Sequence, residues 1–189
     1  MKTKLFLSSL LVVCTLFTAC AKKNDQTTQP AEPAKQNTGN TDAGTSASVV
    51  NNADAFEKAI GSKGTWIVAI TKDLTVDKDL VVEGEFKNGK KDDKGNDQIQ
   101  RKIALYSQDE NRNITARFTL TAPKMTFRSP MGSLQHGTFK GDLYVDVKGF
   151  QLIDTKVDGN VYFTSDENKT TFKMDDKSSI TGKQEVIKK

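Results

Sequence analysis

The sequence predicts an all-β fold of the solenoid type, with short strands that repeat along the chain. The main observation is a recurring phrase, Gly-Asp-Leu-Tyr-Val from Gly141 and Gly-Asn-Val-Tyr-Phe from Gly159, with a weaker copy from Gly182. The copies begin 18 and 23 residues apart, a spacing typical of solenoid turns with two or three short strands each. The second observation is composition. The hydrophobic share is 35% and the mean hydropathy is −0.55, so part of the chain is expected to lie outside the folded core.

Residues 1–19 have the features of an export signal peptide. A charged start, MKTK, precedes the apolar run 5–17, which is too short for a stable bilayer span of about 20 residues. The run ends in the letters FTAC at 17–20, which resemble the lipobox of bacterial lipoproteins. The resemblance implies a diacylglyceryl thioether on Cys20 and cleavage just before it. Ordinary signal cleavage after Ala21 is the alternative, and it would leave no anchor.

Residues 20–50 are predicted to be the lipidated cysteine followed by a disordered tether. They are rich in Thr, Ala, Pro, Gly and Asn and contain almost no large apolar side chains, so they cannot bury enough surface to fold. The second cysteine, Cys14, lies in the leader. Residues 21–189 therefore contain no thiol nucleophile, no disulfide framework and no cysteine-based zinc site.

Residues 51–61 predict one helix ahead of the strands. Asn51 or Asn52 can cap its start, and Gly61 can end it in a left-handed turn. Phe56 and Ile60 share an apolar face with two alanines, and about nine residues are marginal as a helix on their own. We therefore expect this helix to cover the N-terminal end of the strand stack.

Residues 62–189 are assigned to the solenoid domain. The stretch 139–147 alternates between apolar and polar side chains, and 157–164 repeats that alternation. The glycine that opens each copy marks a backbone position of unusual torsion or close approach. A β-sandwich with a similar number of strands is the alternative architecture.

Equivalent residues of stacked turns lie about 4.8 Å apart. Leu143 is therefore expected over Val161 inside the core, and Tyr144 over Tyr162 on the outside. A second apolar pair recurs ahead of each glycine strand, as Met125 and Phe127, Phe150 and Leu152, and Phe172 and Met174. The polar inserts 87–100 and 107–113 are expected to be excursions from the stack.

These repeats and the lipobox together resemble small Gram-positive lipoproteins, especially clostridial ones, that carry a right-handed parallel β-helix. A more distant similarity is to the polymer-forming bactofilin domain. The resemblance covers roughly residues 50–187 and implies a short, single-stranded right-handed parallel β-helix. It also implies attachment to the outer face of the cell membrane, and it leaves end-to-end self-association open.

The bulk charge and the polar residues favour a non-enzymatic role. The formal charge of +4 is too small for a phosphate-binding surface, so no nucleic-acid partner is expected. His136 is the single histidine and is interpreted as a hydrogen-bonding loop residue. Three dispersed aspartates, Asp142, Asp146 and Asp158, do not converge as calcium ligands should. No metal and no cofactor is predicted.

Tyr144 and Tyr162 are interpreted as a structural ladder, and they are also the candidates for weak ligand contact. The predicted function is a membrane-anchored surface lipoprotein with a structural role or with affinity for an envelope component, such as cell-wall glycan or a partner protein. A calcium-dependent polysaccharide-active enzyme on the same fold and a self-assembling scaffold are the alternatives.

Overall fold

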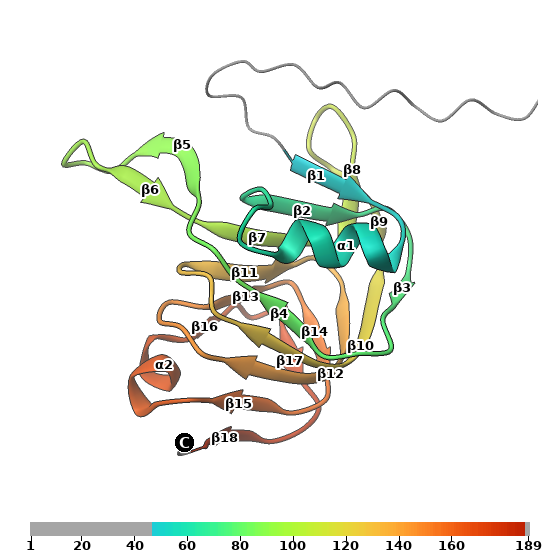
Figure 1. Cartoon of the computed structure of the whole chain (residues 1–189), viewed down its shortest axis with the longest axis vertical. Coiled ribbons are helices and arrows are strands. Elements are labelled where there is room, and N and C mark those ends of the chain that lie inside the picture. The colour runs from blue at the N-terminus through green and yellow to red at the C-terminus, as the bar shows by residue number, and fades with distance from the viewer. Residues whose placement is uncertain (1–46, 188–189) are drawn as a thin grey trace, which may run out of the picture. The chain divides into compact units, whose positions relative to one another are not determined.

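The computed structural model describes residues 47–187, and this part of the chain is mostly strand with two short helices (Figure 1). The helices are α1 (Ala53–Ile60) and α2 (Asp166–Thr171). The strands are β1 (Ala47–Val50), β2 (Ile67–Ile70), β3 (Leu74–Thr75), β4 (Leu80–Val82), β5 (Lys87–Lys91), β6 (Asp97–Ile99), β7 (Arg101–Ala104), β8 (Tyr106–Gln108), β9 (Ile114–Arg117), β10 (Thr119–Phe127), β11 (Gly132–Gln135), β12 (Thr138–Val145), β13 (Gln151–Ile153), β14 (Lys156–Asp158), β15 (Val161–Phe163), β16 (Lys173–Met174), β17 (Ser179–Ile180) and β18 (Gln184–Val186). The predicted all-β class is confirmed.

Most strands pair in parallel and form two larger sheets. Sheet A has the order β1-β2-β7-β11-β13-β16, and sheet B joins β3, β10, β12, β14 and β17 with β4, β15 and β18. Within residues 47–187 the strands of these two sheets other than β1 fall into five successive groups, each pairing with the next: β2–β4, β7 with β10, β11 with β12, β13–β15 and β16–β18. Parallel pairing of neighbours in the chain places equivalent residues of each group above one another.

The predicted stacking of Leu143 and Val161 is confirmed. Leu143 pairs with Val161, and Tyr144 pairs with Tyr162, in the parallel register of β12 and β15. The same inner column continues to Met125 on β10. Leu143, Val161 and Met125 are fully buried. Alternation along each strand therefore separates an apolar core from a polar exterior.

The recurring glycine is explained by close approach between groups. A Cβ at Gly159 would lie 2.1 Å from the carbonyl oxygen of Gly141, and one at Gly182 would lie 2.6 Å from that of Gly159. Gly141 has φ +137, and a Cβ there would lie 1.8 Å from the carbonyl oxygen of Ala122. The backbones touch at these positions, so any side chain would push the groups apart.

The predicted second apolar pair is correct for two of its three copies. Leu152 pairs with Met174, and it pairs on its other side with Leu134. Met125, however, pairs with Leu143 and so belongs to the column of the glycine strands. Met125 and Leu143 are 18 residues apart, the same step as Gly141 and Gly159, but Pro123 stands where the later copies have glycine, so this copy of the phrase was missed.

Helix α1 begins and packs as predicted but ends differently. Asn52 is the N-cap, and its side chain accepts a hydrogen bond from the Ala55 N–H at 2.9 Å. Phe56 and Ile60 are buried in the core. Gly61 was expected in a left-handed turn, but it is extended with φ −71 and ψ 176. The chain turns three residues later, where the Gly64 N–H donates to the Gly61 carbonyl at 3.0 Å.

The folded part begins four residues before the predicted boundary. Residues 47–50 were assigned to the tether, yet they form β1, which pairs in parallel with β2 at the edge of sheet A. Val50 is 8% exposed and belongs to the core. A strand of only four residues gives too weak a sequence pattern to be distinguished from the polar stretch before it.

Both predicted excursions are antiparallel hairpins that project from the stack (Figure 1). The first is β5 with β6, and the second is β8 with β9. The polar segment between β15 and β16 contains helix α2, which was not predicted from the sequence. Ser165 caps it by accepting from the Asn168 N–H at 3.1 Å, and six residues are too few to show a helical repeat.

Arg101 closes the N-terminal end of the stack from inside. It is fully buried and donates to the carbonyls of Thr65 at 2.5 Å and Ala59 at 2.7 Å, with a longer bond of 3.4 Å to Gly61. Its guanidinium lies 4.2 Å from the ring centroid of Phe86. Burial lowers the pKa of Arg101 to about 10, so the side chain stays cationic at neutral pH and satisfies carbonyls at the end of α1.

Candidate functional site

The outer face of the β12 and β15 strands carries the two predicted tyrosines side by side. Tyr144 and Tyr162 point outward, because Leu143 and Val161 beside them point into the core, and both tyrosines are half-buried. Their ring centroids are 4.9 Å apart and the rings are tilted by 40°. The predicted ladder geometry is therefore confirmed, and the pair forms one aromatic surface of two rings.

A polar column runs along one side of the tyrosines. The Lys124 ammonium lies 5.5 Å from the ring centroid of Tyr144 and forms an ion pair with Asp79 at 2.5 Å. In the next groups, Asp142 Oδ1 accepts from the N–H of Asn160 at 3.0 Å and from its Nδ2 at 2.9 Å. This side of the aromatic surface thus offers a cation, a carboxylate and an amide in sequence.

A second polar column lies on the other side. Asp146 Oδ1 accepts from the Thr164 hydroxyl at 2.5 Å, and its Oδ2 lies 3.4 Å from Arg128 Nε. Burial raises the pKa of Tyr162, with a further contribution from the charge of Asp142. The Tyr162 hydroxyl therefore remains protonated at neutral pH and can donate a hydrogen bond.

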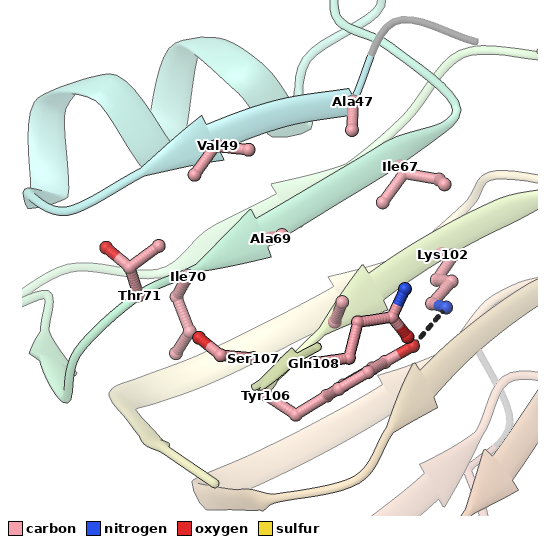
Figure 2. A pocket seen from close by; sticks show the side chains of 11 residues that line it. Ala47, Val49, Ile67, Ala69, Ile70, Thr71, Lys102, Tyr106, Ser107 and Gln108 are labelled. Carbon is pink, nitrogen blue, oxygen red and sulfur yellow. Dashed lines mark hydrogen bonds between the residues drawn. The ribbon is translucent and has the colours of Figure 1, made fainter. Parts of the chain in front are cut away.

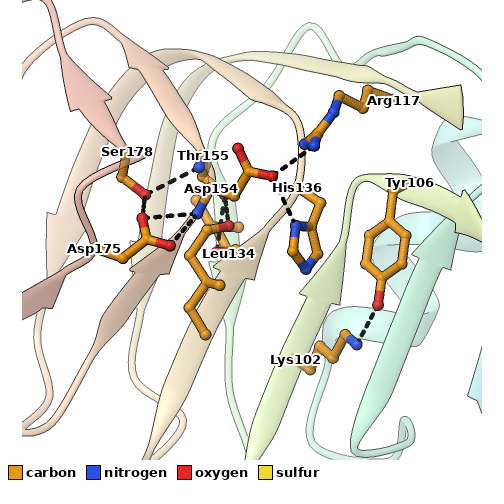
Figure 3. Close-up of polar contacts among 10 residues, drawn as sticks. Lys102, Tyr106, Arg117, Leu134, His136, Asp154, Thr155, Asp175 and Ser178 are labelled. Carbon is orange, nitrogen blue, oxygen red and sulfur yellow. Dashed lines mark hydrogen bonds and ion pairs between the residues drawn. The ribbon is translucent and has the colours of Figure 1, made fainter. Parts of the chain in front are cut away.

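A separate polar network lies at the corner between β11 and β12 (Figure 3). His136 Nδ1 is 3.1 Å from Asp154 Oδ2, and Arg117 Nη2 donates to the same oxygen at 2.6 Å. The hydrogen bond from His136, followed by that from Arg117, lowers the pKa of Asp154. The interpretation of His136 as a hydrogen-bonding loop residue agrees with this geometry.

A pocket of about 270 Å³ adjoins that network (Figure 2). Its apolar floor comes from β1 and β2, and its wall comes from the start of the β8–β9 hairpin. The Lys102 ammonium projects into it from β7 and donates to the Tyr106 hydroxyl at 2.6 Å. The ring of Tyr106 meets His136 edge-on, with centroids 4.6 Å apart.

The aspartates considered for calcium do not converge. Asp142 is bonded to Asn160, and Asp158 accepts from the Thr181 hydroxyl at 3.2 Å. In residues 47–187, no group of three or more His, Cys, Asp or Glu side chains is arranged to hold a metal ion. Cys20, the predicted lipid attachment site, lies outside the described residues. The helices in the described part are also too short or too polar to cross a membrane.

No protein-family model matches the chain, and no curated protein or solved structure matches it either. The case for a function therefore depends on the geometry of the sites described above.

Sequence reasoning missed Lys102, Tyr106, Arg117 and Asp154. Lys102 and Tyr106 are four residues apart in a strand-like run, so period two already places them on one face. That was the available signal, and it indicates a shared face without indicating a pocket. Arg117 and Asp154 are 37 residues apart in the sequence, and the hydrogen bond between them depends on the path of the β8–β9 hairpin.

Proposed function

We propose that this chain is a non-enzymatic, lipid-anchored surface protein whose folded domain is a right-handed parallel β-helix that binds cell-wall glycan. The parallel registers of five successive groups support the β-helix. Right-handedness is supported by the strong general preference for right-handed connections between parallel strands. The anchor rests on the resemblance of residues 17–20 to a lipobox.

The observation that carries the binding role is the aromatic pair between two polar columns. Tyr144 and Tyr162 present ring faces 4.9 Å apart, and aromatic faces supply large contact area to a ligand that is apolar on one side. Lys124 and Asn160 on one side and Thr164 on the other can exchange hydrogen bonds with hydroxyl groups. A sugar ring has this combination of an apolar face and a polar rim.

The spacing supports one sugar ring on the pair. Two rings 4.9 Å apart and tilted by 40° are too close to carry one sugar each. A single ring across both tyrosines would leave its hydroxyls facing Lys124 and Asp142 on one edge. The glycan chain then crosses the strand stack, and affinity depends on both tyrosines together.

Co-sedimentation with purified peptidoglycan tests this role. The double variant Tyr144→Ala with Tyr162→Ala should lose most binding, by about tenfold or more for two lost aromatic contacts. The double Phe variant keeps both rings and serves as the matched control, with binding near that of the wild type. Circular dichroism should show both variants folded. Retention of peptidoglycan by the double Ala variant would show that the aromatic surface is not the site.

The anchor is tested by the intact mass of the protein extracted from membranes. A diacylglyceryl group on Cys20 at the new N-terminus is expected, and Cys20→Ser should release the protein from the membrane fraction. A mature chain that begins at Lys22 and carries no lipid would contradict the anchor. That result would leave the glycan-binding test unaffected.

A further inference from the structure

The pocket between β1, β2 and the β8–β9 hairpin is a second site with its own chemistry. Its floor is apolar, formed by outward side chains of Val49, Ile67 and Ala69, and Val49 is 65% exposed (Figure 2). Farther along the same face of sheet A, strand β11 carries the polar residues Ser133 and Gln135. The apolar area is therefore confined to the pocket.

One end of the pocket carries two hydrogen-bond donors. Lys102 Nζ and the Tyr106 hydroxyl oxygen are 2.6 Å apart, and the ammonium donates. Because that oxygen accepts from Lys102, its own proton points elsewhere, and among residues 47–187 no group accepts it. Within the same residues Lys102 has no carboxylate partner, so its charge is not neutralised by an ion pair.

The donors are held in place before any ligand arrives. The Tyr106 ring lies against His136, which is itself bonded to Asp154 at 3.1 Å. The Lys102 ammonium also lies 4.9 Å from the Tyr106 ring centroid. An ammonium and a hydroxyl group that are held at fixed positions and can both donate favour a ligand group that only accepts hydrogen bonds and is negatively charged.

We propose that this pocket binds a small organic carboxylate with a short apolar body. The carboxylate oxygens accept from Lys102 and Tyr106, and the body lies on Val49, Ile67 and Ala69. The volume of about 270 Å³ limits the body to roughly a short aliphatic chain or one aromatic ring. This site is separate from the tyrosine surface of β12 and β15, and its test is independent of glycan binding.

Ligand-observed NMR on the full chain tests the proposal with hexanoate and phenylacetate. Their neutral counterparts, hexanol and 2-phenylethanol, have the same apolar bodies without the charge. We expect the carboxylates to bind about tenfold more tightly than the alcohols, which is the effect of one charge-assisted hydrogen bond. Equal binding of acid and alcohol would mean an uncharged amphiphile is the occupant and would overturn the proposal.

Variants at the donor end sharpen the test. Lys102→Met should lower carboxylate affinity about tenfold and leave alcohol affinity unchanged. Lys173→Met is the matched control, since Lys173 is exposed on β16 of the same sheet, and it should change neither. Tyr106→Phe provides a second reading in case the Lys102 variant unfolds, and it should weaken the carboxylates alone. Wild-type protein that binds none of the four compounds would also overturn the proposal.

Discussion

The two ends of the strand stack differ in how completely they are covered. At the N-terminal end, α1 buries Phe56 and Ile60 on the core, and Arg101 bonds the carbonyls behind the helix. At the other end of the described residues, Met174 on β16 is 44% exposed and Val186 on β18 is half-buried. Figure 1 shows α1 beside the first strands and β18 at the far end. Inner groups gain contacts on two sides, whereas the last group gains them on one.

The largest expected effect comes from removing the buried cation at the N-terminal end. Arg101→Met keeps a long apolar stem but leaves the carbonyls of Ala59 and Thr65 without their donor. We expect the free energy of unfolding to fall by about 3–5 kcal/mol, because buried polar groups then lose their partner. Urea unfolding followed by circular dichroism measures it.

The control for Arg101 is Arg128→Met. The Arg128 side chain is 52% exposed, so its loss should change stability by no more than about 0.5 kcal/mol. Equal effects of the two variants would mean that the N-terminal end is not held by its buried arginine, and the contrast between the two ends would fail.

A single apolar column measures the contrast directly. Leu152 is 1% exposed in the fourth group, and Met174, its partner in the last group, is 44% exposed. Leu152→Ala should cost about 2–5 kcal/mol through a buried cavity, and Met174→Ala about 1 kcal/mol or less. Chemical denaturation of both variants gives the two values. A large loss at Met174 would indicate that the last group is covered as fully as the inner ones.

The sequence predicts the features that depend on the repeat or on local hydrogen bonds. It leaves open the features that depend on contacts between segments far apart in the chain. The stacking of Tyr144 over Tyr162 and the close approach at Gly159 were readable, because two copies of one phrase align without gaps. Asn52 was readable as a cap, because capping is a local hydrogen bond. These features need no knowledge of the fold beyond the repeat.

Features that depend on chain paths were not readable. The burial of Arg101 was missed because arginine is rarely fully buried and nothing local marks it. The Lys102 pocket forms only when the β8–β9 hairpin lies beside β2. The sequence does not indicate that these two elements are in contact, so the pocket could not be predicted.

Alanine at the recurring glycines gives a smaller test of the two ends. At Gly159 the new Cβ meets backbone on a group with neighbours on both sides, so we expect a loss of about 1–3 kcal/mol from overpacking. At Gly182, in the last group, one close atom is the Asn160 side-chain oxygen at 2.5 Å, and β18 has one pairing neighbour. The last group can therefore shift outward, and the loss should be clearly smaller. Thermal unfolding compares the two.

Gly61→Ala is the control for the glycine variants. Gly61 has φ −71, and a Cβ there would lie 3.6 Å from its nearest neighbour. Alanine fits without strain and lowers the entropy of the unfolded chain, so we expect no loss or a gain of about 0.4–1 kcal/mol. Gly159 and Gly182 variants of equal stability would argue against a loose last group.

The smallest expected effect is loosening of the last group by acid. Asp175 accepts from the Asp154 N–H at 2.9 Å and from the Ser178 hydroxyl at 2.6 Å, and so links the fourth and fifth groups. The Ser178 hydrogen bond, followed by the Asp154 N–H, lowers the pKa of Asp175 below its ordinary 3.8. A lowered folded-state pKa means that the folded form binds fewer protons, so this contribution is present above about pH 4 and is lost as the pH falls through the folded pKa.

Amide exchange followed by NMR between pH 5 and pH 2.5 should therefore show β16 and β17 losing protection before β12. Asp175→Asn removes the titrating carboxylate and should make the protection of β16 lower at pH 5 and less dependent on pH. Asp92→Asn is the control, because Asp92 also has a lowered pKa, set by hydrogen bonds from Asn96, but lies in the β5–β6 hairpin, away from the last group. Simultaneous loss of protection in β12 and β16 would mean that the groups unfold as one unit. The difference in stability between the two ends would then be smaller than the coupling between neighbouring groups.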